Sequence, residues 1–126
     1  MNGFHLAALT NIAGILLFSR GLVGSTLGQH FPGLFGFWGL VCIILWGLAY
    51  LSVARSYAKV PALVAVFGLE KLVYVASWVW WLMGSGGQLG AIFAQDALAG
   101  VFFAAYGAID LAFAVYFLGV YRKLSR

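Results

Sequence analysis

Acidic residues and cysteine are both scarce in this sequence, and each shortage excludes a class of site. The 126 residues include three Asp and Glu residues in total and one cysteine, Cys42. A single cysteine cannot form an intramolecular disulfide, nor can it supply a zinc or iron–sulfur site built from cysteine ligands. His5 and His30 flank opposite ends of the first apolar segment, so they cannot share a metal ion. We therefore expect no metal site and no resident cofactor.

Catalytic sequence motifs are missing as well. There is no HExxH zinc motif, no nucleophile elbow and no evident Ser–His–Asp set. Residues 84–87, Gly-Ser-Gly-Gly, resemble a phosphate-binding loop only superficially, because they follow an expected helix rather than a strand. The sequence favours a non-enzymatic function, although it leaves an enzyme open.

The fraction of charged residues is too low for a soluble fold. Charged residues make up 8% of the chain and hydrophobic residues 64%, whereas soluble domains are about a quarter charged and about half apolar. The net charge of +4 does not indicate nucleic-acid binding, because most basic residues lie in two short segments beside apolar runs. We predict an integral membrane protein whose surroundings are the lipid bilayer, with no nucleic-acid partner.

Four apolar segments are long enough to cross a bilayer as helices, which takes roughly 20 residues each. We expect these helices at residues 4–27, 34–53, 62–83 and 97–121. Pro61 suits the first turn of the third helix, the glycines of residues 84–87 should end it, and Asp96 is the expected N-cap of the fourth. The predicted fold is all-α, a single transmembrane domain over residues 1–126, arranged as an up-down-up-down four-helix bundle.

The basic residues predict the orientation of this bundle. Arg55 and Lys59 lie between the second and third helices, and Arg122, Lys123 and Arg126 follow the fourth. With four spans, these two regions fall on the same side of the membrane, and the positive-inside rule places that side in the cytoplasm. We expect both termini to be cytoplasmic.

The first apolar segment does not have the order of a secretory signal peptide. No Lys or Arg precedes residues 6–18, and Arg20 follows them closely. A signal peptide has its positive charge before the apolar region. We expect the segment to be retained as the first helix.

Four ionisable residues fall within the expected helices: Arg20, Glu70, Lys71 and Asp110, with a net charge of zero. Each would cost about 2.5–3.5 kcal/mol at the centre of a membrane helix, so we expect them to face one another. Counted from the cytoplasmic ends, Glu70 lies about 13 Å deep and Asp110 about 16 Å deep. Neighbours on a helix point about 100° apart, so Lys71 needs a partner on another helix. Asp110 is the natural candidate, and Arg20 is then the partner of Glu70, although the reverse pairing stays open.

Aromatic residues at helical spacing surround these charges. Tyr74 and Trp78 share a helix face with Lys71, and Tyr106 shares one with Asp110. An aromatic cavity with a few charges is typical of a site for a lipophilic ligand. The predicted ligand-binding residues are Arg20, Glu70, Lys71, Tyr74, Trp78, Tyr106 and Asp110. The charges could instead form a structural cluster that sets the helix register, or contact a second protein.

Small residues recur at four-residue spacing in the fourth helix, at Gly100, Ala104, Ala108 and Ala112. Such spacing lets a neighbouring helix approach closely. We expect this face to pack against another helix, either within the chain or in a homo-oligomer or partner membrane subunit.

Three segments carry a resemblance to a known family: residues 54–61 (Ala-Arg-Ser-Tyr-Ala-Lys-Val-Pro), 68–72 (Gly-Leu-Glu-Lys-Leu) and 106–117 (Tyr-Gly-Ala-Ile-Asp-Leu-Ala-Phe-Ala-Val-Tyr-Phe). Together with the residues between them they resemble the DoxX-like group of small four-helix bacterial membrane proteins. The resemblance implies a multi-pass protein of the bacterial inner membrane, often of unknown activity and sometimes an accessory subunit in quinone-linked redox chemistry. It transfers no catalytic residues.

Three functions follow as hypotheses from these features. The first is a membrane protein that binds or transports a small lipophilic or protonatable ligand through the buried charges. The second is a structural or accessory subunit of a membrane complex, which the lack of any catalytic constellation supports. The third is a lipid-modifying membrane enzyme with Glu70 or Asp110 as general acid or base, because a buried carboxyl group is suited to that role.

Overall fold

Helices make up all of the regular structure, which confirms the predicted all-α class. The computed structural model describes all 126 residues, Met1–Arg126. The elements in order are α1 (Gly3–Phe18), α2 (Thr26–His30), α3 (Pro32–Phe35), α4 (Phe37–Val53), η1 (Tyr57–Lys59), α5 (Pro61–Ser85), η2 (Gly86–Gln88), α6 (Leu89–Gln95) and α7 (Ala97–Leu124).

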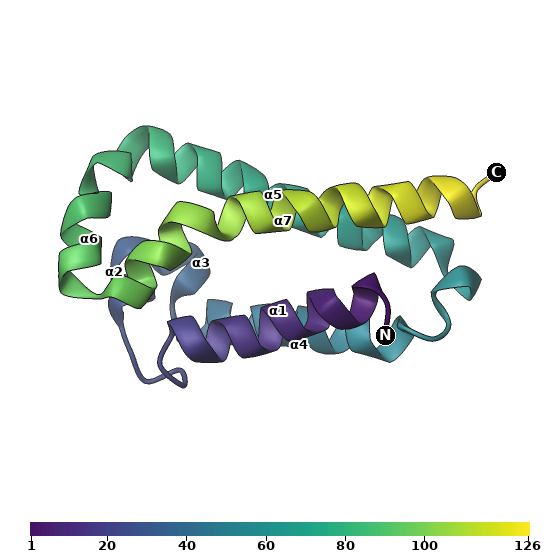
Figure 1. Ribbon diagram of the computed structural model, residues 1–126, viewed down its shortest axis with the longest axis horizontal. Helices are drawn as coiled ribbons and strands as arrows, with labels where there is room; N and C mark the ends of the chain where they lie inside the picture. The colour runs from purple at the N-terminus through teal and green to yellow at the C-terminus, as the bar shows by residue number, and fades with distance from the viewer.

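The four long helices form two layers that run along the longest axis of the molecule (Figure 1). One layer pairs α1 with α4, and the other pairs α5 with α7. Contacts between α1 and α7 join the layers. The short helices α2, α3 and α6 gather at one end, called here the short-helix end. Both termini and the connection between α4 and α5 lie at the other end, called here the terminal end.

Two stretches are long and apolar enough to cross a membrane. They are Pro61–Gln95, which combines α5, η2 and α6, and Ala97–Leu124. The apolar helices α1 and α4 have 16 and 17 residues, so they are only about 24–26 Å long against a hydrocarbon core of about 30 Å.

The expected first helix, residues 4–27, is wrong at its C-terminal end. Helix α1 ends at Phe18, and Arg20, Gly21 and Leu22 have φ angles of 53°, 72° and 70°. Left-handed backbone at two non-glycine residues needs support from its surroundings. Ser19 supplies it, because its hydroxyl donates to the carbonyl of Ile15 at 2.5 Å and accepts from the backbone N–H of Leu22 at 3.0 Å.

The other helix boundaries differ less from expectation. The segment 34–53 is divided at Gly36, whose extended backbone (φ −67°, ψ 172°) separates α3 from α4. The segment 62–83 continues through Gly84 to Ser85, and residues 89–95, expected as loop, form α6. The fourth helix continues past residue 121 to Leu124. The predicted N-cap is confirmed, because the Asp96 carboxylate accepts from the backbone N–H of Ala99 at 3.3 Å.

The core consists of two apolar clusters with a polar layer between them. The cluster toward the short-helix end includes Phe35, Trp81 and Phe103, and the cluster toward the terminal end includes Phe4 and Phe67. In α1, α5 and α7 the two clusters are separated by the positions that carry polar side chains: Asn11, Glu70, Lys71 and Asp110. The chain therefore places its buried polar groups at one level of the bundle.

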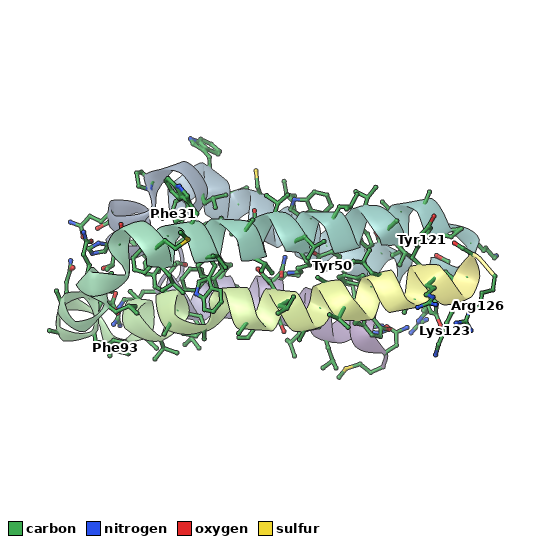
Figure 2. All side chains as sticks on the ribbon, turned by 90° about the horizontal axis from the view of Figure 1, so that it is seen from above. Phe31, Tyr50, Phe93, Tyr121, Lys123 and Arg126 are labelled. Atoms are coloured by element: carbon green, nitrogen blue, oxygen red, sulfur yellow. The ribbon has the colours of Figure 1, made fainter.

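Apolar side chains cover much of the outside of the molecule. Only 29 of the 126 residues are buried, and large side chains such as Leu9, Leu69, Val73 and Val115 are more than half exposed. Side chains project outward along the whole length of the helices (Figure 2). An apolar surface of this extent marks contact with a membrane or with other proteins.

The small residues of α7 do not pack as a continuous face inside the chain. Gly100 is buried against Phe93 of α6, but Ala104, Ala108 and Ala112 are exposed. The prediction of close packing is wrong within the chain for these three alanines, because α5 contacts a different face of α7. Gly107, on that other face, lies directly under the Trp78 indole.

Candidate functional site

The polar layer lies between the two apolar clusters and draws on four helices. Asn11 comes from α1, Tyr50 from α4, Glu70 and Lys71 from α5, and Asp110 from α7. Tyr50 lies near the middle of the long axis (Figure 2). Asn11, Glu70, Lys71 and Asp110 lie near the middle of their helices, whereas Tyr50 lies in the last turn of α4 and reaches the same level of the bundle through its side chain.

Lys71 is the centre of this layer and joins three helices. Its side chain is 2% exposed, and its ammonium group donates to Asn11 Oδ1 at 2.8 Å and to Asp110 Oδ1 at 3.0 Å. Asn11 in turn donates to the carbonyl of Ile43 in α4 at 3.0 Å. The predicted pairing of Lys71 with Asp110 is confirmed. Hydrogen bonds to an ionised donor are about twice as strong as neutral ones, so this network fixes the register of α1, α5 and α7.

Aromatic rings lie beside the same ammonium group. The Lys71 Nζ atom is 5.2 Å from the centre of the Tyr50 ring and 5.7 Å from that of Phe113. A cation within about 6 Å of a ring face is attracted by its quadrupole. The rings therefore offset part of the cost of removing the charge from water.

Glu70 has no cationic partner. Its side chain is 9% exposed, and it accepts a hydrogen bond from the Tyr50 hydroxyl. No Lys, Arg or His nitrogen lies within 4.0 Å of its carboxylate. The predicted pairing of Arg20 with Glu70 is wrong.

Arg20 lies outside the polar layer because α1 ends before it. Its guanidinium donates from Nη2 to Asp96 Oδ1 at 2.7 Å and from Nε to Asp96 Oδ2 at 3.4 Å, at the start of α7. The Arg20 side chain is 54% exposed. The hydrogen bond from Arg20 holds the pKa of Asp96 below its usual value, and the backbone N–H of Ala99 acts in the same direction. This pair ties the loop after α1 to the junction of α6 and α7.

A cavity of about 120 Å³ opens beside the polar layer between α1 and α7. Its polar wall contains Asn11, Glu70, Lys71 and Asp110. Predicted site residues Tyr74 and Tyr106 also line it, together with apolar side chains such as Phe18 and Phe102. The cavity therefore combines apolar walls with charged groups at one end, which is the usual character of a small-molecule site.

Trp78 does not line this cavity. Its indole N–H donates to the carbonyl of Phe103 at 2.8 Å, and its ring packs over Gly107. The position of Trp78 does not support the prediction that it contacts a ligand. Gly107 has no side chain, which leaves room for the Trp78 ring between α5 and α7. Tyr106 keeps its place at the cavity, and its hydroxyl lies 2.9 Å from Ser77 Oγ.

Three residues of the site were not predicted as ligand contacts. They are Asn11, Tyr50 and Gly14, none of which is among the predicted ligand-binding residues. Gly14 lines the cavity, and a Cβ at this position would meet no atom within 4 Å. A polar residue at mid-helix could have identified Asn11, whereas no sequence signal distinguishes Gly14 from the other glycines of the chain.

The site has no arrangement for a metal ion, because no group of three or more His, Cys, Asp or Glu side chains is close enough to hold one. What it offers is an ammonium donor, two carboxyl groups and two tyrosine hydroxyls around an open space. Such groups can hold a proton or form hydrogen bonds with the polar end of a bound molecule. Comparison with protein-family models, curated protein sequences and solved structures gives no match.

Proposed function

We propose that this chain is a multi-pass membrane protein whose cavity binds or moves a small lipophilic or protonatable ligand. In this proposal α1, α4, α5 and α7 cross the bilayer as a four-helix bundle, with both termini in the cytoplasm. The ligand lies beside Lys71, Glu70 and Asp110, near the middle of the membrane.

Four features bear on the membrane placement. The exposed apolar side chains along the helices match a lipid environment. The basic residues Arg55, Lys59, Arg122, Lys123 and Arg126 all belong to the terminal end, where Lys123 and Arg126 are marked in Figure 2. Helices α1 and α4, with 16 and 17 residues, are the shorter pair of the four long helices and fit a bilayer that is thinned locally, at a cost of a fraction of a kcal/mol per Å of mismatch. At the short-helix end, Trp38 and Trp80 are 77% and 70% exposed, as expected for side chains at a membrane interface.

The resemblance to DoxX-like proteins is part of the same proposal. Glu70, Lys71 and Asp110 all lie within the segments that carry it. On this basis we assign the protein to the bacterial inner membrane.

One observation carries the proposed function: an open cavity adjoins charged groups that are otherwise buried. If the ion cluster were only structural, we would expect side chains to fill the space beside it, because atoms that line an empty space lose dispersion contacts. The volume of about 120 Å³ is close to the roughly 150 Å³ of an apolar cavity known to hold benzene. The site therefore suits a ligand, or a part of one, about the size of a single ring.

Filling the cavity from α1 should weaken binding of a ring-sized probe. Gly14→Leu is expected to weaken the affinity for phenol by about tenfold or more, equivalent to about 1.4 kcal/mol, because the added side chain occupies the open space. Saturation-transfer NMR on the protein in lipid nanodiscs measures this affinity. Gly119→Leu is the matched control, since Gly119 also lies in open space on a helix but away from the cavity. Equal phenol affinity in the two variants and the wild type would show that the cavity is not a ligand site.

A further inference from the structure

The polar layer has more negative than positive groups. It contains one cation, Lys71, and two carboxyl groups, Glu70 and Asp110. Arg20, which would have balanced the sum, is paired with Asp96 at the short-helix end. Lys71 pairs with Asp110, so Glu70 is the carboxyl group without a cation. An unpaired charge in an apolar environment is so costly that the group takes up a proton or acquires a counter-ion.

The free oxygens of both carboxyl groups belong to side chains that line the cavity. Tyr50 donates to Glu70 Oε1, and Lys71 donates to Asp110 Oδ1. Glu70 Oε2 and Asp110 Oδ2 have no hydrogen-bond partner in the protein. Glu70 is more than nine-tenths buried, yet it borders the open space. The cavity therefore has two unused acceptor oxygens, one of them on Glu70, which has no cationic partner in the protein.

The rest of the wall also favours a cation. Phe18, Phe35, Phe102, Tyr74 and Tyr106 line the cavity. Aromatic rings attract cations through their negative faces, and such rings are the usual surroundings of bound quaternary ammonium groups. The volume limits the ligand to a small head, such as an ammonium nitrogen with methyl substituents.

We propose that the cavity binds a small organic ammonium ion, which replaces one proton held by either Glu70 or Asp110. This inference rests on the proposed function and names the class of its ligand. When the cation enters, a carboxyl O–H bond breaks and the proton leaves to solvent, so the net charge of the layer stays the same. The groups that face the two carboxyls are Lys71 from α5, Tyr50 from α4 and Asn11 from α1, with the hydroxyls of Tyr74 and Tyr106 on the cavity wall.

Calorimetric titration of the full chain in phosphatidylcholine nanodiscs tests this proposal. The probe is tetramethylammonium, and tert-butyl alcohol is a neutral molecule of similar size. We expect tetramethylammonium to bind about tenfold or more tightly than the alcohol, a difference of about 1.4 kcal/mol or more. Repeating the titration in buffers of different ionisation enthalpy gives the number of protons released, which should approach one for each cation bound.

Removing either carboxyl group should abolish both the preference for tetramethylammonium and the release of a proton. The layer would then hold one cation, Lys71, and one carboxylate, so no negative charge is left for the ligand to neutralise. Glu70→Gln keeps an acceptor for the Tyr50 hydroxyl, and Asp110→Asn keeps one for Lys71, so each variant provides a check on the other if one fails to fold. Asp96→Asn is the control, because this carboxylate lies outside the cavity.

The possible results separate the two proposals. Equal affinity for the cation and the alcohol would overturn the cation inference and leave a ligand cavity in place. Binding of neither probe, together with no effect of Gly14→Leu on phenol, would overturn both. Cation binding without proton release would show that the two carboxyl groups do not exchange a proton for the ligand.

Discussion

Replacing Lys71 with Met is expected to lower the free energy of unfolding by about 3–5 kcal/mol, the usual cost of removing one partner from a buried ion pair. The methionine chain fills much of the space of the lysine stem but leaves Asp110 without its ammonium partner. Asn11 Oδ1 loses its donor at the same time. The contacts of α5 with α1 and α7 weaken together, because one nitrogen atom serves both.

Unfolding in mixed micelles of mild detergent and dodecyl sulfate measures this loss. Lys59→Met is the matched control, since Lys59 is exposed in the connection between α4 and α5 and forms no ion pair. Adding Asp110→Leu to Lys71→Met should recover most of the stability, because no uncompensated charge of that pair is left. A loss below about 1 kcal/mol in the single variant, the size seen for exposed ion pairs, would show that the pair is solvated rather than buried.

Replacing Gly47 with Leu is expected to cost about 1–3 kcal/mol through overpacking. A Cβ at Gly47 would lie 2.8 Å from Ile12 Cγ1, 3.0 Å from Asn11 Cβ and 3.2 Å from the carbonyl oxygen of Ala8. The last of these atoms is backbone, so the contact is relieved only if α1 moves away from α4. Asn11 would move with α1 and lose its geometry toward Lys71.

Two measurements check this prediction. The free energy of unfolding should fall relative to Gly119→Leu, which adds the same side chain to a helix where no atom is within 4 Å of the new Cβ. Binding of tetramethylammonium should weaken as well, because the cavity is bounded by α1. If Gly47→Leu were as stable as Gly119→Leu, the close contact of α1 with α4 would be refuted.

Depth along a helix is the part of the site that could be predicted from the sequence. A rise of about 1.5 Å per residue places Glu70, Lys71 and Asp110 at similar distances from Pro61 and Tyr121, and the Lys71–Asp110 pair follows from that count. The same arithmetic fails for Arg20, because it assumed a helix through residue 27. The turn at Ser19 contains no proline and lies in an apolar run, so hydropathy does not detect it.

Contacts between side chains on different helices could not be predicted in the same way. Tyr50 reaches Glu70 only because α4 and α5 meet at this level, which depends on how the two layers are offset. The exposure of Ala104, Ala108 and Ala112 likewise depends on which face of α7 is occupied by α5. The position of Trp78 depends on Gly107, and spacing along α5 alone does not indicate that the indole lies over a glycine rather than at the cavity.

The central claim is that the polar layer lies at mid-membrane, and a spin label at residue 111 tests it most directly. Leu111 is 47% exposed and adjoins Asp110, so the label reports the depth of the layer without entering the bundle. In a Cys42→Ala background reconstituted in bilayers, this label should collide mainly with dissolved oxygen, whereas labels at Ser56 and Gln88 should collide mainly with a polar nickel chelate. A label at residue 111 that meets the nickel chelate as readily as one at Ser56 would contradict the account.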